Sequence, residues 1–262
     1  MTAGITRRIF VVGCPRSGTT VLQSLVGAHP RVRAFPESHF FARAAASPRD
    51  EAMRHLRRFL DAAGVELPAA AAELSAIEAF VAALDGAALG AGADMWTEKT
   101  PRHLHHVDLI AAHVPDVRFV HVLRRGVDAV RSLHRVTREA PERWGGRPRS
   151  VGHCVRRWER DVRISLGYAR APAHHLVRYE TLVARPEKVA WGLCEFLGVE
   201  RDRAMLEARA AVAAAVTLPG ETWKERAAAP LEASPHTEEL PGVVEATAVT
   251  QALLDDLLPA EL

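Results

Sequence analysis

Residues 9–20 of the chain read IFVVGCPRSGTT. The run Ile9–Val12 is β-branched and aromatic, which is typical of a buried parallel strand. The stretch Gly13–Gly18 contains two glycines, a proline and a serine, and this composition predicts a loop. From Thr19 to Pro30, apolar residues recur at helical spacing. The beginning of the chain is therefore expected to form a strand, a glycine-rich loop and a helix.

This loop has the pattern of a nucleotide-phosphate loop, G-x-x-x-x-G followed by hydroxyl residues. Backbone N–H groups of such a loop point into one concavity, and the helix end adds about +0.5 of an elementary charge, so a phosphate or sulfate group binds there. Thr19 replaces the lysine that reaches the terminal phosphates of ATP and GTP, whereas Arg16 places a cation inside the loop. Triphosphate hydrolysis is therefore disfavoured. The structural alternative is a tight strand-to-helix turn without a ligand.

A second anion site is predicted after the strand candidate Arg118–Leu123, which is followed by Arg124. Ligands of open parallel sheets bind at the carboxyl ends of strands, where Arg124 would lie. Ser132 follows about two helical turns later, on the same side of the helix as Asp128. An arginine and a hydroxyl converging there would hold a second phosphate of the same nucleotide. The structural alternative is a solvated arginine and a serine bonded to its own helix.

Strand and helix patterns alternate along the chain, which predicts an α/β fold with a mainly parallel central sheet flanked by helices. Residues 31–41 are expected to be irregular. The alanine-rich stretch from Ser47 to Asp94 is expected to form helices joined by loose turns. The other predicted elements are strands at Arg118–Leu123 and His175–Glu180 and helices at Val151–Leu166, Pro186–Gly198 and Ala252–Leu258.

The length of 262 residues suits a single domain over residues 1–262. Within it, residues from about 42 to 95 are expected to form a helical insertion or lid over an acceptor, and residues from about 215 to 262 a C-terminal lid and helix. The 34 lysines and arginines nearly balance the 32 aspartates and glutamates, for a net charge of +2. This balance argues against a nucleic-acid or membrane-surface binder, so any anion site must be local.

Three widely spaced cysteines favour a reducing compartment over a disulfide framework: Cys14, Cys154 and Cys194. No apolar run approaches the roughly 18 residues of a membrane span, and no apolar segment of a signal peptide precedes the first strand. A cytoplasmic enzyme or binding protein is therefore expected. The oligomeric state cannot be inferred from these patterns.

Together, the motifs resemble those of PAPS-dependent sulfotransferases, most of all the bacterial and tyrosylprotein branch. PAPS (3′-phosphoadenosine 5′-phosphosulfate) is the sulfuryl donor, and PAP is its product. The resemblance implies a P-loop-type three-layer fold and PAPS as co-substrate without a metal. Arg124 and Ser132 match the family's grip on the 3′-phosphate, and Tyr179 is similar to a tyrosine that contacts the nucleotide. The family's P-R-S-G-T-T loop, which holds the 5′-phosphosulfate, corresponds to Pro15, Arg16, Ser17, Gly18, Thr19 and Thr20.

Sulfuryl transfer depends on positioning and charge stabilisation, as phosphoryl transfer does. Glu37 is the candidate general base, because tyrosylprotein-type enzymes carry their catalytic glutamate in the corresponding place. The neighbouring Phe35, Phe40 and Phe41 are expected to desolvate Glu37 and raise its pKa. His39 is the alternative base.

The segment Glu98-Lys99-Thr100-Pro101 is similar to the N-K-[DT]-P element of the resembled branch, with Glu98 in place of asparagine. The resemblance implies that Lys99 contacts the sulfuryl group or its bridging oxygen, with Arg16 on the other side. The structural alternative is a solvated lysine before a helix-capping Thr-Pro pair.

Some family features are missing. No R-K-G element follows, and Trp223-Lys224 is the candidate substitute, with Lys224 on a phosphate and Trp223 near the nucleotide. An arginine expected twelve residues after Arg124 is replaced by Val136. A cluster of histidines lacks the ligand pattern of a zinc site, so solvated or core-edge histidines are expected there and no metal is predicted. These histidines are His103, His105, His106 and His113.

The predicted function is transfer of the sulfuryl group of PAPS to a hydroxyl or amine of a small-molecule or natural-product acceptor. Two alternatives stay open: a P-loop kinase or NTPase with lysine and magnesium ligands from unusual positions, and a non-catalytic nucleotide-binding module. The acceptor's identity and the choice between O- and N-sulfation are not readable from the sequence.

Overall fold

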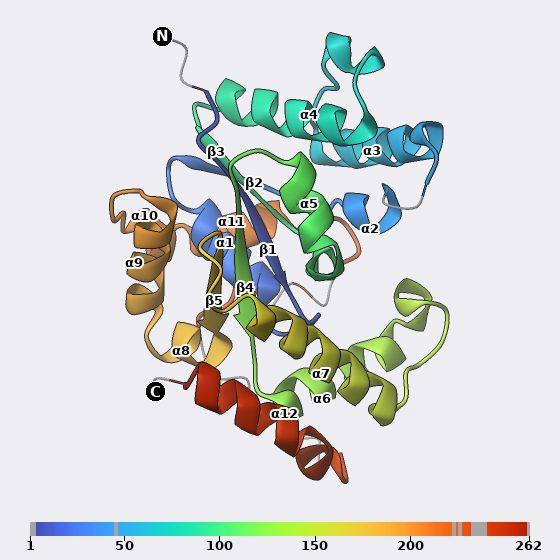
Figure 1. The fold of residues 1–262 in the computed structure, drawn as a ribbon, viewed down its shortest axis with the longest axis vertical. Coiled ribbons are helices and arrows are strands. Elements are labelled where there is room, and N and C mark those ends of the chain that lie inside the picture. Colours follow the sequence, from blue (N-terminus) through green and yellow to red (C-terminus); the bar gives the residue numbers. More distant parts are fainter. Residues whose placement is uncertain (1–3, 45–46, 222–223, 225–226, 232–239, 261–262) are drawn as a thin grey trace.

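The computed structural model describes residues 4–44, 47–221, 224, 227–231 and 240–260. Five strands form one sheet in the order β2-β3-β1-β4-β5, and every pairing is parallel (Figure 1). The central strand continues into the phosphate loop. The predicted α/β fold with a parallel sheet is therefore confirmed. The strands are β1 (Arg7–Gly13), β2 (Val32–Phe35), β3 (Met95–Lys99), β4 (Val117–Leu123) and β5 (His174–Arg178).

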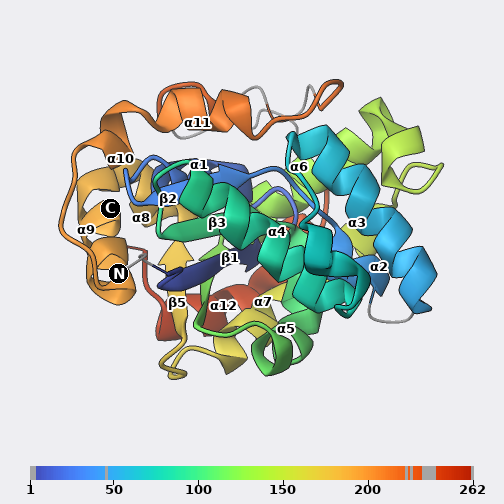
Figure 2. The same ribbon diagram turned by 90° about the horizontal axis from the view of Figure 1, so that it is seen from above.

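Helices cover both faces of the sheet. Seen from above, α1 and α11 lie on one side of the strands, and α5, α7 and α12 lie on the other (Figure 2). The helices are α1 (Thr19–Gly27), α2 (Phe40–Ala44), α3 (Arg49–Ala63), α4 (Ala76–Gly90), α5 (Val107–His113), α6 (Gly126–Glu139), α7 (Val151–Gly167), α8 (Tyr179–Ala184), α9 (Pro186–Leu197), α10 (Ala204–Glu207), α11 (Arg209–Ala215) and α12 (Val243–Leu257). Three short 3₁₀ helices, η1 (Ala69–Ala72), η2 (Pro101–His106) and η3 (Pro141–Trp144), complete the described elements.

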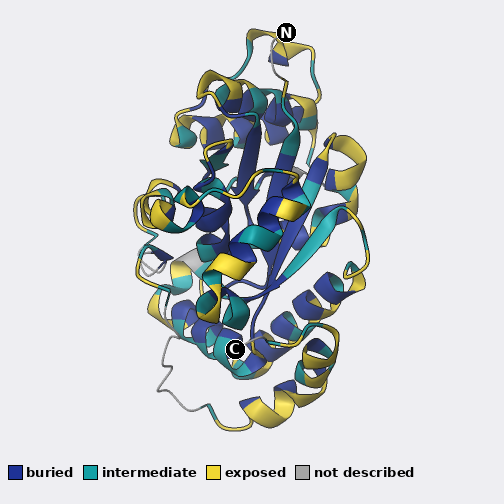
Figure 3. Cartoon of the chain, turned by 90° about the vertical axis from the view of Figure 1, so that its left-hand side faces the viewer, coloured by how far each residue is buried: buried dark blue, intermediate teal, exposed yellow. Residues whose placement is uncertain are grey.

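Strand β1 is buried on both faces, which explains its continuous apolar run. Ile9 and Val11 pack with residues of α1 and α9. Phe10 and Val12 point to the opposite face and pack with residues of α2 to α5. Figure 3 shows the same division, with strands largely buried and exposed residues gathered on the outer sides of the helices.

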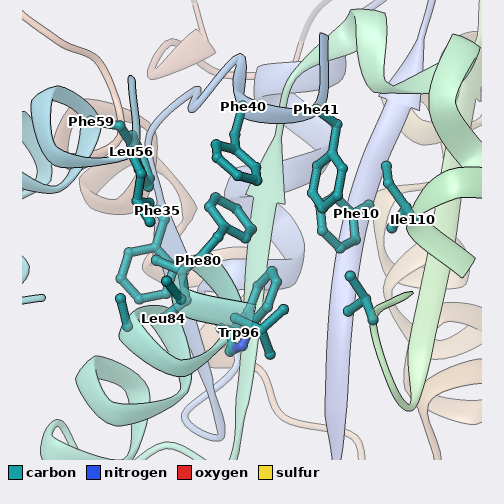
Figure 4. Packing of buried hydrophobic residues seen from close by; sticks show 14 of the residues in the cluster. Phe10, Phe35, Phe40, Phe41, Leu56, Phe59, Phe80, Leu84, Trp96 and Ile110 are labelled. Atoms are coloured by element: carbon teal, nitrogen blue, oxygen red, sulfur yellow. The ribbon is translucent and has the colours of Figure 1, made fainter. Parts of the chain in front are cut away.

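An aromatic cluster joins the alanine-rich segment to the sheet (Figure 4). Phe80 of α4 stacks on Phe40 of α2, with ring centroids 4.7 Å apart. Phe41 lies edge-on to both Phe10 and Phe80, at 5.7 and 5.5 Å. Aromatic pairs of this geometry contribute about 0.5–1.5 kcal/mol each beyond their buried area. Helix α4 therefore shares the main core with β1, and the cluster packs α2 against both of them.

Three sequence predictions of local structure were wrong. Residues 31–41, expected to be irregular, contain β2, which pairs with β3. Strand β3 was not predicted, because Thr97, Glu98 and Lys99 interrupt any apolar run, yet all three are buried. Strand β5 ends at Arg178, so Tyr179 begins α8 instead of ending the strand.

Helix α12 begins at Val243, nine residues before the helix expected from the apolar run at Ala252. It packs against α6 and α7. The N–H of Gly126 donates to Oε1 of Gln251 at 2.9 Å. A Cβ on Gly126 would lie 2.8 Å from both Thr247 and Trp158, so this contact requires glycine. In the described part of the chain, no helix has the length and apolar character needed to cross a bilayer.

Replacing Gly126 with alanine is expected to destabilise the fold by about 1–3 kcal/mol, because the added methyl overpacks the contact between α6, α7 and α12. Gly86→Ala is the matched control, since Gly86 is exposed in the middle of α4 with no atom within 4 Å of an added Cβ. That variant should gain about 0.5–1 kcal/mol from helix propensity. Urea unfolding measures both, and equal effects of the two substitutions would contradict the packing argument.

Candidate active site

The loop between β1 and α1 closes around a concavity at the carboxyl end of the central strand. Arg16 and Gly18 have positive φ angles of 73° and 96°, a conformation that turns neighbouring N–H groups toward one point. The N–H of Ser17 donates to the carbonyl of Cys14 at 3.2 Å, which tightens the turn. The Ser17 hydroxyl is buried and has no hydrogen-bond partner among the described residues. A buried orphan hydroxyl in a loop of this shape fits a bound anion.

The second anion motif lies directly against this loop. The ring of Tyr179 covers Gly18 so closely that a Cβ there would come within 2.3 Å of it. The guanidinium carbon of Arg124 lies 4.4 Å from the centroid of the same ring, a cation–π contact. Arg124 also donates to the carbonyl of Arg16 at 3.2 Å, and Arg16 Nε donates to Ser132 Oγ at 3.2 Å. The fold thus brings together five groups that were predicted from three separate stretches of the sequence.

A buried ion pair forms the other half of the site. Glu37 follows β2, Lys99 ends β3, and Lys224 comes from the C-terminal segment. Lys99 Nζ donates to Glu37 Oε1, and Lys224 Nζ lies 2.8 Å from the same oxygen. Lys224 is also paired with Glu221 at 2.6 Å. Lys99 is 2% exposed and Lys224 is 4% exposed, so both ammonium groups are withdrawn from solvent and neutralised by carboxylates.

The pKa of Glu37 moves in the direction opposite to the sequence prediction. Burial alone would raise this pKa, but the ammonium groups of Lys99 and Lys224 outweigh burial and hold it well below its usual range. Phe40 and Phe41 point into the aromatic core instead of determining the charge state of Glu37. In this state Glu37 is a firmly ionised carboxylate.

His39, the alternative base, lies beside Glu37, with its Nε2 3.4 Å from Glu37 Oε2. Burial lowers the pKa of His39 more than the neighbouring carboxylates raise it. His39 has a positive φ of 52°, and its N–H donates to Thr100 Oγ1 at 3.1 Å, which holds the strained residue in place. Both candidate bases line the same cavity.

Glu98, predicted only as a replacement for asparagine, organises the backbone next to Glu37. Its Oε1 accepts from the N–H and hydroxyl of Ser38 at 2.8 and 2.9 Å and from the Thr100 hydroxyl at 2.6 Å. Its Oε2 lies 3.0 Å from His103 Nδ1. Burial raises the pKa of Glu98, but the electrostatic interaction with His103 and then the hydrogen bonds from His103, Thr100 and Ser38 outweigh burial and lower it. Glu98 is therefore a buried, ionised and fully bonded carboxylate.

His103 completes this network. Its Nε2 accepts from the N–H of Phe41 at 3.3 Å, so the ring proton sits on Nδ1 and is donated to Glu98. His103 was expected only to be a solvated or core-edge histidine. Its spacing of five residues from Glu98 carried no recognisable signal, because a 3₁₀ helix rather than an α-helix brings the two together.

The site opens into a cavity of about 390 Å³. Among the residues of the predicted acceptor segment 42–95 that the structure describes, only Ala42 and Arg43 line it. The α6, η3 and α7 region forms one side of the cavity, and the phosphate loop, the Glu37 and Lys99 segments and the C-terminal segment form the rest. Trp223 lies outside the described residues. The other lining residues are Pro15, Arg16, Thr19, Thr20, Glu37, His39, Lys99, Pro101, Arg102, Leu133, Thr137, Trp144, Gly145, Arg149, His153, Arg157, Glu221 and Lys224.

The chemistry of this site is anion binding beside a carboxylate. Cations surround a loop of inward N–H groups, and the carboxylates of described residues that line the cavity are those of Glu37 and Glu221. In the described ranges, no group of three or more histidine, cysteine, aspartate or glutamate side chains is arranged to hold a metal ion.

A three-layer α/β fold with a phosphate loop after its central strand defines a P-loop-type protein. Within that class, the model of the sulfotransferase family matches residues 8–203, which is most of the chain. The chain therefore belongs to the sulfotransferase family, as its motifs predicted.

Two curated relatives are protein-tyrosine sulfotransferases. Protein-tyrosine sulfotransferase 1 of Danio rerio is 29% identical over 209 residues, covering 76% of this chain and 55% of that protein. Protein-tyrosine sulfotransferase 2 of Gallus gallus is 29% identical over 199 residues, covering 73% and 51%. The chain spans about half the length of these relatives.

Solved structures share the fold at lower identity. The sulfotransferase domain of the Synechococcus PCC 7002 olefin synthase is 18% identical, with a TM-score of 0.58 and 94% of each chain covered. A sulfotransferase of Mycobacterium avium is also 18% identical, with a TM-score of 0.60, covering 99% of this chain and 79% of that one.

Gly18→Ala is expected to weaken PAP binding at least tenfold, because the new Cβ would displace the Tyr179 ring from the loop. Gly64→Ala is the control: Gly64 also has a positive φ, of 62°, but no atom lies within 4 Å of an added Cβ. The Gly64→Ala variant should therefore lose stability through backbone strain but keep its affinity for PAP. Calorimetric titration measures both, and unchanged affinity in Gly18→Ala would contradict the assigned contact.

Glu98→Gln is expected to cost about 1–3 kcal/mol of stability, because its amide N–H would face the Nδ1–H of His103 and leave one buried donor unsatisfied. Glu78→Gln on the exposed face of α4 keeps its capping box and should change stability by less than about 0.5 kcal/mol. Urea unfolding gives both values, and ¹⁵N spectra report the His103 tautomer. Equal stability of the two variants would refute the network.

Proposed function

We propose that this chain is a PAPS-dependent sulfotransferase that transfers the sulfuryl group to a hydroxyl or amine of a small-molecule or natural-product acceptor. One observation carries the proposal. The phosphate loop carries Arg16 and lacks the usual lysine. On one side it contacts Arg124, Ser132 and Tyr179. On the other side it opens to the buried Glu37, which is paired with Lys99 and Lys224. Two anion sites joined in this way suit a nucleotide with phosphates at both its 5′ and 3′ positions.

The donor would lie along the loop. Residues Arg16 to Thr20 would hold the 5′-phosphosulfate, and the buried Ser17 hydroxyl offers an unused donor there. Arg124 and Ser132 would hold the 3′-phosphate, with Tyr179 beside the nucleotide. A mouse sulfotransferase complexed with PAP has a similar fold, with a TM-score of 0.53 and 11% identity over 96% of this chain and 83% of that one, which supports this choice of donor.

The ion pair suggests how the base would be activated. PAPS supplies a sulfuryl group on a phosphate leaving group. Lys99, Lys224 and Arg16 would turn toward that negative charge, and Glu37 would lose the cations that depress its pKa. Glu37 would then take the acceptor proton as the new bond to sulfur forms and the bond to the 5′-phosphate breaks. His39 is the second candidate for this step, since it lines the same cavity.

Two segments would enclose the reaction, as the sequence suggested. Residues of about 215–262 would act as a C-terminal lid, because they contribute Glu221 and Lys224 to the cavity. Arg209 of α11 donates to the carbonyls of Ala227 and Ala229 and so anchors this segment. Residues of about 42–95 would form the helical insertion, which reaches the acceptor only through Ala42 and Arg43.

Calorimetric titration with PAP and AMP, which differ only by the 3′-phosphate, tests the donor. We expect PAP to bind at least tenfold more tightly, with no requirement for Mg²⁺, and Ser132→Ala to reduce this ratio. Glu37→Gln should keep PAP affinity within about threefold while abolishing sulfate transfer from PAPS to an acceptor panel followed by mass spectrometry. Preferential binding of ATP with Mg²⁺ would favour a kinase instead, and turnover by Glu37→Gln would shift the base to His39.

A further inference from the structure

We infer that the acceptor of this enzyme carries an anionic group, a carboxylate, phosphate or sulfate, which is bound by Arg157 together with Arg149 and His153 at the α7 side of the cavity. The inference rests on the proposed function, because it concerns the second substrate of the same site. It assigns a charge to that substrate, which the sequence left open.

The first support is the concentration of positive charge in the cavity. Among the described residues, seven lysine and arginine side chains line it, against two glutamates, although the whole chain is nearly balanced. Arg16, Lys99 and Lys224 belong to the loop and to the Glu37 pair. The four arginines that remain lie outside both donor motifs: Arg43, Arg102, Arg149 and Arg157.

These four arginines are separate from the proposed grip on the 3′-phosphate. Arg124, Ser132 and Tyr179, which form that grip, do not line the cavity. Arg16 lies between the two regions, since its Nε donates to Ser132 while its side chain also lines the cavity. The charge at the α7 side is therefore available to the acceptor.

Arg157 provides the second, independent support. Its Nε donates to Oδ2 of Asp161 at 2.7 Å, and Asp161 is 1% exposed and also lies 2.9 Å from His105 Nε2. The buried carboxylate of Asp161 therefore holds the guanidinium group of Arg157 in a fixed position. Nη2 of Arg157 is buried and has no hydrogen-bond partner in the part of the chain that the structure describes. A buried charged donor without a partner destabilises the free protein, and an anionic group of the acceptor would satisfy it.

Arg149 and His153 are held beside Arg157. Nη2 of Arg149 donates to the carbonyl of Trp144 at 3.1 Å, and its backbone N–H donates to Thr137 Oγ1 at 3.2 Å, so the segment before α7 is fastened to α6. His153 precedes Arg157 by four residues and shares its helix face. Partial burial, and then the surrounding Arg149, Arg156, Arg157 and Arg160, lower the pKa of His153.

The shape of the cavity defines the rest of the acceptor. A volume of about 390 Å³ suits a small molecule. Leu133 and Trp144 give this wall an apolar and aromatic part, so a ring or short hydrocarbon body fits between the anion site and Glu37. The chemical class is therefore a small hydroxyl or amine compound with an apolar body and one anionic group.

Paired acceptors test the inference. 4-Hydroxyphenylacetate and other small hydroxy acids are each compared with the neutral amide of the same compound, with PAPS as donor and mass spectrometry of the sulfated product. We expect the acids to be preferred at least tenfold in kcat/KM. Arg157→Gln should abolish that preference while leaving the rate with the amides and the affinity for PAP within about twofold. Arg149→Gln leaves the Arg157–Asp161 ion pair intact and should reduce the same preference for acids. This variant tests the inference if Arg157→Gln is unstable.

Arg156→Gln is the matched control, because Arg156 is exposed on the same helix and does not line the cavity. It should keep the preference of the native chain. Equal use of acids and amides, sulfation of no acid in the set, or loss of PAP affinity in Arg157→Gln would overturn the inference. Preference for tyrosine in an acidic peptide over all small acids would overturn the small-molecule assignment. Failure of PAP itself to bind would instead refute the proposed function.

Discussion

The buried carboxylate of Glu37, shared by Lys99 and Lys224, joins three segments that are far apart in the sequence. Removing one partner from such a cluster leaves an uncompensated charge in a desolvated place, whereas the complete cluster, which includes the Glu221 carboxylate paired with Lys224, is neutral. The arrangement therefore requires β2, β3 and the C-terminal segment to be in place together. It also places the ammonium groups of Lys99 and Lys224 where an anionic donor would bind. The same charges therefore stabilise the folded chain and would bind the donor.

The parallel sheet makes this convergence possible. Strands β1, β3 and β4 end at the same edge, and each delivers a cation or an anion-binding loop there: the phosphate loop, Lys99 and Arg124. Glu98 points from the end of β3 into a closed network with Ser38, Thr100 and His103, which fixes the backbone directly after Glu37. Two adjacent residues of β3 therefore hold the same loop. Glu98 binds the loop backbone at Ser38, and Lys99 binds the carboxylate of Glu37.

Positive charge is distributed unevenly across the molecule. A chain with a net charge of only +2 places seven lysines and arginines around one cavity, with Asp161 buried behind Arg157 to hold it in position. Such local concentration attracts anions without giving the protein a generally basic surface. Both substrates of the proposed reaction would therefore meet the protein through the same physical interaction.

The sequence by itself determined the central strand, the phosphate loop, the flanking helices and the family, because apolar periodicity and a contiguous glycine-rich motif are local properties. It also named Arg124 as a candidate from its place after a strand, and the resemblance to the family added Glu37, Lys99 and Tyr179. Only the tertiary structure placed β2, which is four residues long, and β3, whose buried polar residues hide the strand pattern. It alone revealed the lowered pKa of Glu37, the Glu98–His103 network and the arginines that line the cavity beside α7. These depend on charges and hydrogen bonds between residues distant in sequence, and no local pattern encodes such distances.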